Sequence, residues 1–140
     1  MPTPDGRLAH DRARGFGART WYFPDGDRPP IVDGPAEPHE SLMILNVSDR
    51  PAHVLIDVFW TDRPPTIGLA TTVAPERVVS LRAPWAERDA HGAPFDIPVR
   101  EQYALRLRSD VPVVCQYGRL ELVPSFALYT TMGLNDPGED

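Results

Sequence analysis

The fold of this chain is decided by the stretch LMILNVSDRPAHVLIDVFW, residues 42–60. Two apolar runs, 42–47 and 52–60, flank the segment SDRP, whose serine, aspartate and proline are typical of a turn. Apolar and polar side chains alternate within the second run, which is the pattern of a half-buried β-strand. We therefore predict two strands joined as a hairpin.

The two faces of the strand predicted over 52–60 differ in chemistry. One face carries Val54, Ile56, Val58 and Trp60, and the other carries His53, Leu55, Asp57 and Phe59. The first face is apolar enough to form a core. The second is mixed, and we expect it to pack against a neighbouring subunit or a ligand rather than open water.

Short apolar runs of the same kind continue along the chain. They predict strands over 19–23, 68–73, 77–82, 102–108, 113–122 and 126–131, and one short helix over 85–90. The 17 prolines and 10 glycines among 140 residues also favour short strands and turns over long helices. We predict an all-β fold, a single antiparallel β-sandwich of jelly-roll type.

The ends of the chain are polar, and they set the expected domain boundaries. We predict a flexible N-terminal arm over residues 1–15, a β-sandwich domain over 16–134 and a disordered acidic tail over 135–140. Within the domain, the proline-rich loop 24–38 is longer than most connections. This length indicates a functional lid or a partner contact.

Composition argues against several classes of protein. A net charge of −6 is unfavourable for nucleic-acid binding, which needs a basic surface. The one cysteine, Cys115, lies in an apolar run and is expected to be a buried thiol without a disulfide partner. No run reaches the roughly 18 apolar residues of a membrane span, and no signal peptide is recognisable, so we expect a cytoplasmic protein.

Motifs for catalysis are not found in this sequence. The four histidines lie far apart without an H-x-H pair, so no metal site is predicted. There is no G-x-S-x-G elbow and no glycine-rich phosphate loop. We expect that this protein is not an enzyme and has no cofactor. The alternative is a hydrolase or isomerase, because the fold can bring histidine, glutamate and arginine side chains together.

Two polar residues frame the apolar run 42–47. In a strand, Glu40 and Asn46 share one face with Leu42 and Ile44. One interpretation places both polar groups at the rim of a recess. In the other, Asn46 caps the turn at 48–49 and Glu40 ends the strand in solvent.

Arg119 and Trp21 are further candidates. Cys115, Tyr117, Arg119 and Glu121 alternate onto one face of an otherwise apolar strand. Arg119 therefore needs a carboxylate partner, which Glu121 or Glu40 could supply, either as an ion pair or beside a ligand. Trp21, next to the long loop, is a candidate for stacking on a sugar ring.

Five segments, in this order and spacing, resemble the sensory rhodopsin transducer family. They are GARTW (17–21), His39-Glu40 followed by ILN (44–46), AHV (52–54), VAPER (73–77) and SDVPVVCQYGRLE (109–121). The resemblance implies a β-sandwich of about eight strands, a cyclic homotetramer, and a soluble signalling or ligand-sensing role without catalysis.

The family's recurring polar positions correspond to Trp21, His39, Glu40, Asn46 and Arg119 in this sequence. The resemblance implies that they bind a small molecule such as a sugar, without a metal. The alternative is a transducer that couples a membrane receptor to a target, with the same residues holding subunits together. The outer face of 53–59 and the loop 24–38 would then form the contacts.

Overall fold

The computed structural model describes residues 4–6, 9–82 and 97–136, so the helix predicted over 85–90 lies outside the described residues. In these ranges one short helix, α1 (Ala9–Arg14), precedes eight strands. The strands are β1 (Ala18–Asp27), β2 (His39–Asn46), β3 (Ala52–Trp60), β4 (Thr66–Val73), β5 (Arg77–Arg82), β6 (Gln102–Glu121), β7 (Ala127–Met132) and β8 (Leu134–Asn135). The all-β fold is confirmed.

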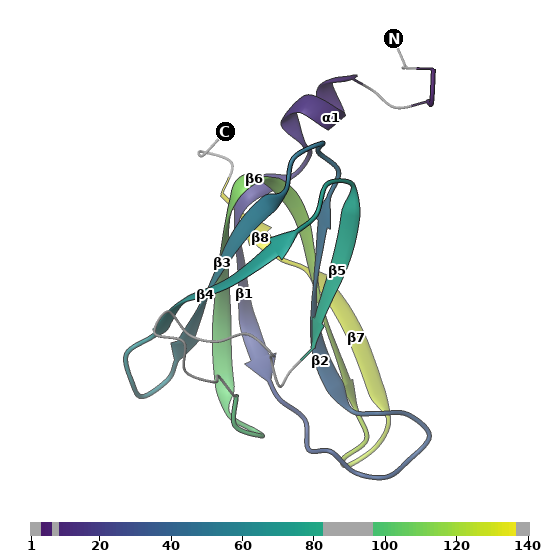
Figure 1. Cartoon of the computed structure of the whole chain (residues 1–140). Helices are drawn as coiled ribbons and strands as arrows, with labels where there is room; N and C mark the ends of the chain where they lie inside the picture. The colour runs from purple at the N-terminus through teal and green to yellow at the C-terminus, as the bar shows by residue number, and fades with distance from the viewer. Residues whose placement is uncertain (1–3, 7–8, 83–96, 137–140) are drawn as a thin grey trace.

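The strands form the two layers of a sandwich (Figure 1). Sheet I has the strand order β4-β3-β6-β1-β8, and sheet II has the order β5-β2-β6-β7. Strand β6 belongs to both sheets, because its first half pairs with β1 and β3 and its second half with β2 and β7. All pairs are antiparallel.

Strand β6 supplies the central row of the core. Every second residue from Tyr103 to Tyr117 is buried, as strict alternation predicts. The sequence predicts two strands here, over 102–108 and 113–122. The structure has one strand instead. Its pairing with β1 shifts register between Ala18 and Thr20, and Pro112 lies opposite this irregularity, where no regular ladder bond is required.

The predicted hairpin between β2 and β3 is wrong. Strand β2 pairs with β5 and β6 in sheet II, whereas β3 pairs with β4 and β6 in sheet I. The segment 47–51 therefore crosses from one layer to the other. Each strand has one apolar face, and both faces are buried against the same core from opposite sides. A short polar connection can form either a hairpin turn within one sheet or a crossing between two sheets, so the sequence of this connection does not distinguish them.

Helix α1 contacts this crossing segment. The Asp49 amide donates to the carbonyl oxygen of Arg12 at 2.7 Å, and Arg50 Nη2 donates to the carbonyl of Ala13 at 3.2 Å. Arg12 Nε also lies 3.4 Å from a carboxylate oxygen of Glu76. The sequence pattern does not predict this six-residue helix. The domain boundaries at 15/16 and 134/135 stay predictions.

Cys115 is expected to be chemically inert in the folded protein. Its side chain has no exposed surface, and burial raises the pKa of the thiol. A thiol reagent such as Ellman's reagent should therefore label it more than a hundredfold more slowly in buffer than in 6 M guanidinium chloride. Rapid labelling of the native protein would contradict the core position of Cys115.

Candidate functional site

Glu40 is the buried charge around which the candidate site is built. It lies at the start of β2 and faces the core, where its side chain is 1% exposed. Its Oε2 accepts a hydrogen bond from the Asp27 amide at 2.9 Å and another from the hydroxyl of Tyr117. The carboxylate thus links sheet II to the end of β1 in sheet I. This position in the core excludes the interpretation in which Glu40 ends the strand in solvent.

Arg119 lies directly across from Glu40 on β6. Its Nε is 3.7 Å from Glu40 Oε2, which identifies Glu40 as the expected carboxylate partner. Its Nη2 donates to the carbonyl oxygen of Asp25 at 3.0 Å and lies 3.6 Å from the Asp25 carboxylate. Burial opposes the charge of Arg119, but the neighbouring tyrosines and Glu40 raise its pKa, so it stays protonated.

Tyrosine hydroxyls complete the cluster. Burial, the charge of Glu40 and the neighbouring tyrosine raise the pKa of Tyr103, and burial and Glu40 raise that of Tyr117, so both hydroxyls stay neutral and can donate hydrogen bonds. The Arg119 guanidinium carbon lies 5.9 Å from the ring centre of Tyr117 and 5.2 Å from that of Tyr129. The site is therefore a fixed ion pair enclosed by aromatic rings.

Three polar atoms of this cluster are buried without a hydrogen bond to the described residues. They are Glu40 Oε1, the hydroxyl of Tyr103 and Arg119 Nε. Buried polar atoms in proteins nearly always have a partner, so three such atoms in one place call for an explanation.

Of the five residues that the sequence assigns to the site, the structure brings together Glu40 and Arg119. His39 precedes Glu40 and points to the other face of β2; its Nδ1 lies 2.8 Å from the carbonyl oxygen of Glu37. Asn46 is six residues along the strand, about 20 Å away at 3.3 Å per residue. Trp21 is 4% exposed, and its Nε1 donates to the carbonyls of Ala18 and Val113.

Asn46 holds the crossing between the two sheets. Its Oδ1 accepts bonds from the amide and hydroxyl of Ser48, at 3.0 and 2.7 Å. Its Nδ2 donates to the carbonyl oxygens of Arg50, Val73 and Ala74 at 2.7 to 3.3 Å. This is the turn-capping alternative that the sequence offers.

Replacement of Asn46 by alanine is expected to cost about 2–3 kcal/mol of stability, because it leaves several buried backbone groups without a partner. Urea unfolding would measure this loss. A loss well below 1 kcal/mol would contradict this role of Asn46 in the crossing.

Sequence patterns do not single out four residues near the site: Asp25, Tyr103, Tyr117 and Tyr129. The inward alternation of β6 does place Tyr103 and Tyr117 in the core. The hydroxyl groups of these two tyrosines could have indicated the site from the sequence, since a buried hydroxyl needs a polar partner. Asp25 lies where the pairing of β1 with β6 shifts register between Phe23 and Gly26, which a sequence pattern does not show.

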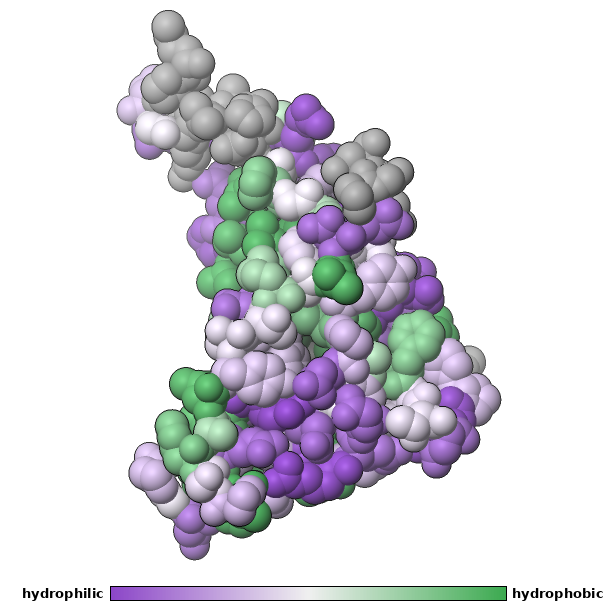
Figure 2. Space-filling view, turned by 180° about the vertical axis from the view of Figure 1, so that it is seen from behind, coloured by the Kyte–Doolittle hydropathy of each residue, from purple (hydrophilic) through white to green (hydrophobic). Residues whose placement is uncertain are grey.

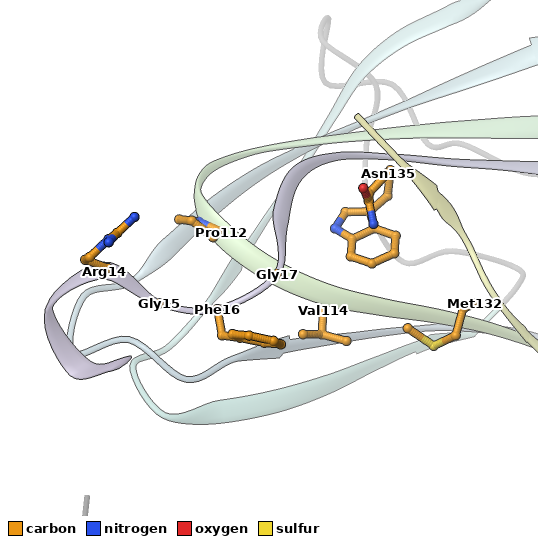
Figure 3. Close-up of a pocket in the computed structure, with 9 residues that line it drawn as sticks. Arg14, Gly15, Phe16, Gly17, Pro112, Val114, Met132 and Asn135 are labelled. Atoms are coloured by element: carbon orange, nitrogen blue, oxygen red, sulfur yellow. The ribbon is translucent and has the colours of Figure 1, made fainter. Parts of the chain in front are cut away.

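Two recesses open near these residues. One of about 550 Å³ includes Asp25, Tyr117 and Tyr129 in its lining, so it adjoins the Glu40–Arg119 cluster. The other, of about 490 Å³, is lined by Phe16, Val114 and Met132, which lie in a row, with Arg14 beyond one end of that row (Figure 3). It also includes Trp21. Both recesses are mostly apolar, and the first is the better candidate because it adjoins the Glu40–Arg119 cluster.

The architecture defines a small antiparallel β-sandwich domain with one enclosed charge cluster. Among residues 4–6, 9–82 and 97–136, no three histidine, cysteine, aspartate or glutamate side chains are grouped so that they could hold a metal ion. The only helix there, α1, is too short to cross a membrane, and no described helix has the required length and hydropathy.

Comparison with known proteins identifies the family. The model of the family described as Anabaena sensory rhodopsin transducer matches residues 16–135. The crystal structure of Thermotoga maritima 1070 is similar with a TM-score of 0.73 and 32% identity, over 86% of this chain and 96% of that one. The Anabaena sensory rhodopsin transducer has a TM-score of 0.58 and 31% identity, over 73% and 88%. A comparison with curated proteins finds no match.

The chain belongs to the Anabaena sensory rhodopsin transducer family. This confirms the resemblance inferred from the five sequence segments. The family and its structural neighbours support a signal-transduction module, and they suggest a non-catalytic one.

Proposed function

We propose that this protein is a non-enzymatic signalling module that binds a small hydroxyl-rich molecule, such as a sugar or polyol, at the Glu40–Arg119 cluster. The observation that carries the proposal is the group of three buried polar atoms without a partner, Glu40 Oε1, the Tyr103 hydroxyl and Arg119 Nε. A ligand hydroxyl both donates and accepts, so it can bond to a carboxylate and to the two donors at once.

The surroundings of the cluster support a ligand of this class. The adjoining recess of about 550 Å³ falls within the usual range of small-molecule sites. The rings of Tyr117 and Tyr129 lie 6.2 Å apart at its wall and offer apolar surface for the C–H face of a sugar ring. Asp25 and Tyr117, which line the recess, connect it to the cluster through their bonds to Arg119 and Glu40.

Each residue of the predicted site has a role in this proposal. Glu40 and Arg119 bind ligand hydroxyls, and His39 lies next to them at the start of β2. Trp21 and Asn46, whose polar atoms are already bonded to the protein, hold the strands around the site. No cofactor takes part.

The test is a thermal-unfolding screen with sugars, polyols and sugar acids. A ligand at a hundred times its dissociation constant adds about 2.7 kcal/mol to the free energy of unfolding, so binding is visible as a saturable shift. Tyr103→Phe is the sharpest variant, because it removes a single hydroxyl that faces Glu40 and leaves the ring in place. It should change the free energy of unfolding by about 1 kcal/mol or less while weakening the ligand at least tenfold.

Ser109→Ala is the matched control, since Ser109 is a buried hydroxyl on the same strand. It should leave ligand affinity unchanged. A screen without any shift, or a shift that Tyr103→Phe does not reduce, would overturn the proposed site.

The likeness to the Anabaena sensory rhodopsin transducer favours a second candidate function, in which the protein couples a membrane receptor to a cytoplasmic target. In this case no small molecule is needed, and the buried cluster joins the two sheets. A folded protein that binds a receptor but shifts with no compound in the screen would support this candidate over the first.

We also propose that the protein acts as a cyclic homotetramer in the cytoplasm. Support comes from the outer face of sheet II, where Met43, Leu45, Val78 and Met132 are 38% to 61% exposed. Figure 2 shows apolar side chains gathered at its upper left, on the side that holds β2, β5 and β7. A monomer rarely exposes a large apolar patch. Light scattering that gives a monomer mass would contradict this assembly.

A further inference from the structure

The outer face of sheet I carries a second charge cluster, which the proposed ligand site does not use. Asp57 on β3 has no exposed surface although it lies on this outer face. Its Oδ2 accepts bonds from Arg106 Nε at 2.8 Å and Arg108 Nε at 3.0 Å. Its Oδ1 accepts bonds from Arg108 Nη2 at 2.9 Å and the Gly68 amide at 3.0 Å. The carboxylate thus fixes both guanidinium groups.

The cluster has a net positive charge. One carboxylate faces two guanidinium groups on a chain whose net charge is −6. The side chains of Arg106 and Arg108 are 31% and 40% exposed. The terminal nitrogens of Arg106 and one terminal nitrogen of Arg108 take no part in the bonds to Asp57, and Arg106 also shares a hydrogen bond with the neighbouring Tyr22. The remaining N–H groups of these nitrogens can donate to the carboxylates of a partner.

An apolar recess of about 340 Å³ adjoins the arginines on the same face. Tyr22, Phe59, Ala104 and Leu134 line most of its outer part, and Leu134 is 71% exposed. Arg106 borders it, because Arg106 pairs with Tyr22 across the sheet and its guanidinium carbon lies 5.2 Å from the ring centre of Phe59. The apolar recess and the cationic side chain of Arg106 are therefore adjacent.

The spacing of these groups along β6 fits an extended chain. Ala104, Arg106 and Arg108 are successive outward residues, and each step of two residues is about 7 Å. An extended peptide presents every second side chain at the same interval. We propose that this surface binds an extended acidic segment of a partner protein, with one apolar side chain in the recess and acidic side chains two and four positions further on at Arg106 and Arg108.

Charge complementarity favours a partner of this kind over a second copy of the chain. A two-fold contact centred on the cluster would bring the arginines of one copy against those of the other. The inference rests on the signal-transduction role of the protein. Its charged groups are separate from the Glu40–Arg119 cluster, whereas its apolar recess shares Tyr22 and Leu134 with the recess proposed for the small molecule.

The test begins with selection from a displayed library of random heptapeptides against the wild-type protein. We expect enriched peptides with acidic residues at alternate positions beside an apolar residue. The best peptide is then labelled with a fluorophore, and its affinity is measured by anisotropy. Its dissociation constant should rise at least tenfold in Arg108→Gln and in Leu134→Asp, and also when salt increases from 50 to 500 mM.

Leu134→Asp guards against a folding artefact, because Leu134 is a highly exposed side chain outside the ion-pair cluster. Val99→Glu is the matched control, an acidic change at a 46% exposed apolar residue that precedes β6 and belongs to neither proposed surface, and should change the affinity less than twofold. Selection without an alternating acidic pattern, or equal affinity in Leu134→Asp, would overturn the proposal. A fall in oligomer mass in Arg108→Gln with unchanged peptide affinity would also overturn it and assign the face to self-association. The ligand screen at Glu40 should be unaffected by Arg108→Gln, because Arg108 does not line the recess beside the Glu40 cluster.

Discussion

Replacing Gly17 with alanine should lower the free energy of unfolding by about 3 kcal/mol or more. Gly17 has a φ of 108°, which residues with a side chain rarely adopt. An added Cβ would lie 2.0 Å from the carbonyl oxygen of Val113, in the backbone of β6. Because that oxygen also accepts the bond from Trp21 Nε1, the strand cannot move without loss elsewhere. Urea unfolding, followed by circular dichroism, measures the change.

Gly6 provides the control for the backbone conformation alone. Its φ is 83°, and no atom lies within 4 Å of the position that a Cβ would occupy. Gly6→Ala should therefore cost about 1 kcal/mol or less, from backbone strain without a clash. Equal losses in the two variants would show that the close approach to Val113 is not what requires glycine at position 17.

Local sequence patterns predict best those strands that have one face in the core, such as β3 and β6. The strands over 52–60 and 77–82 have the observed bounds, and the inward and outward residues of β6 alternate as expected. Pairing is harder to predict, because it depends on partners far apart in the sequence. Strand β2 lies between β5 and β6, and the turn residues at 48–51 do not reveal that the chain changes sheets there.

For the candidate site too, the sequence predicts which strand face a residue occupies but not which residue it contacts. Glu40 and Asn46 share the inward face of β2, as predicted, but one face of a strand spans both ends of a sandwich. The pattern therefore cannot tell that Glu40 meets Arg119 whereas Asn46 meets Ser48 and the backbone at Val73. That distinction depends on which strands pair and in which register.

The second large effect is expected at Asp57. Asp57→Ala should lower the free energy of unfolding by about 3–5 kcal/mol, because it removes one partner of a buried ion pair. Arg106, Arg108 and the Gly68 amide would all lose the oxygen to which they donate. The exposed pair of His53 and Asp110 is the control, and Asp110→Ala should cost less than about 1 kcal/mol. Equal losses would contradict a special role for the buried carboxylate.

The pH dependence gives an independent test of the same carboxylate. Burial alone would raise the pKa of Asp57, but the bonds from Arg108, Arg106 and the Gly68 amide outweigh it, and the pKa lies below the ordinary value of 3.8. The unfolded chain therefore binds the proton more readily than the folded one, so the free energy of unfolding decreases as the pH is lowered through this range. The contribution of Asp57 should be complete above about pH 4 and disappear as pH falls through its folded pKa.

The stability difference between wild type and Asp57→Asn, measured from pH 7 down to 2, should shrink in that window. A difference that stays constant to pH 2 would mean that packing or amide geometry, and not the charge of Asp57, accounts for the loss.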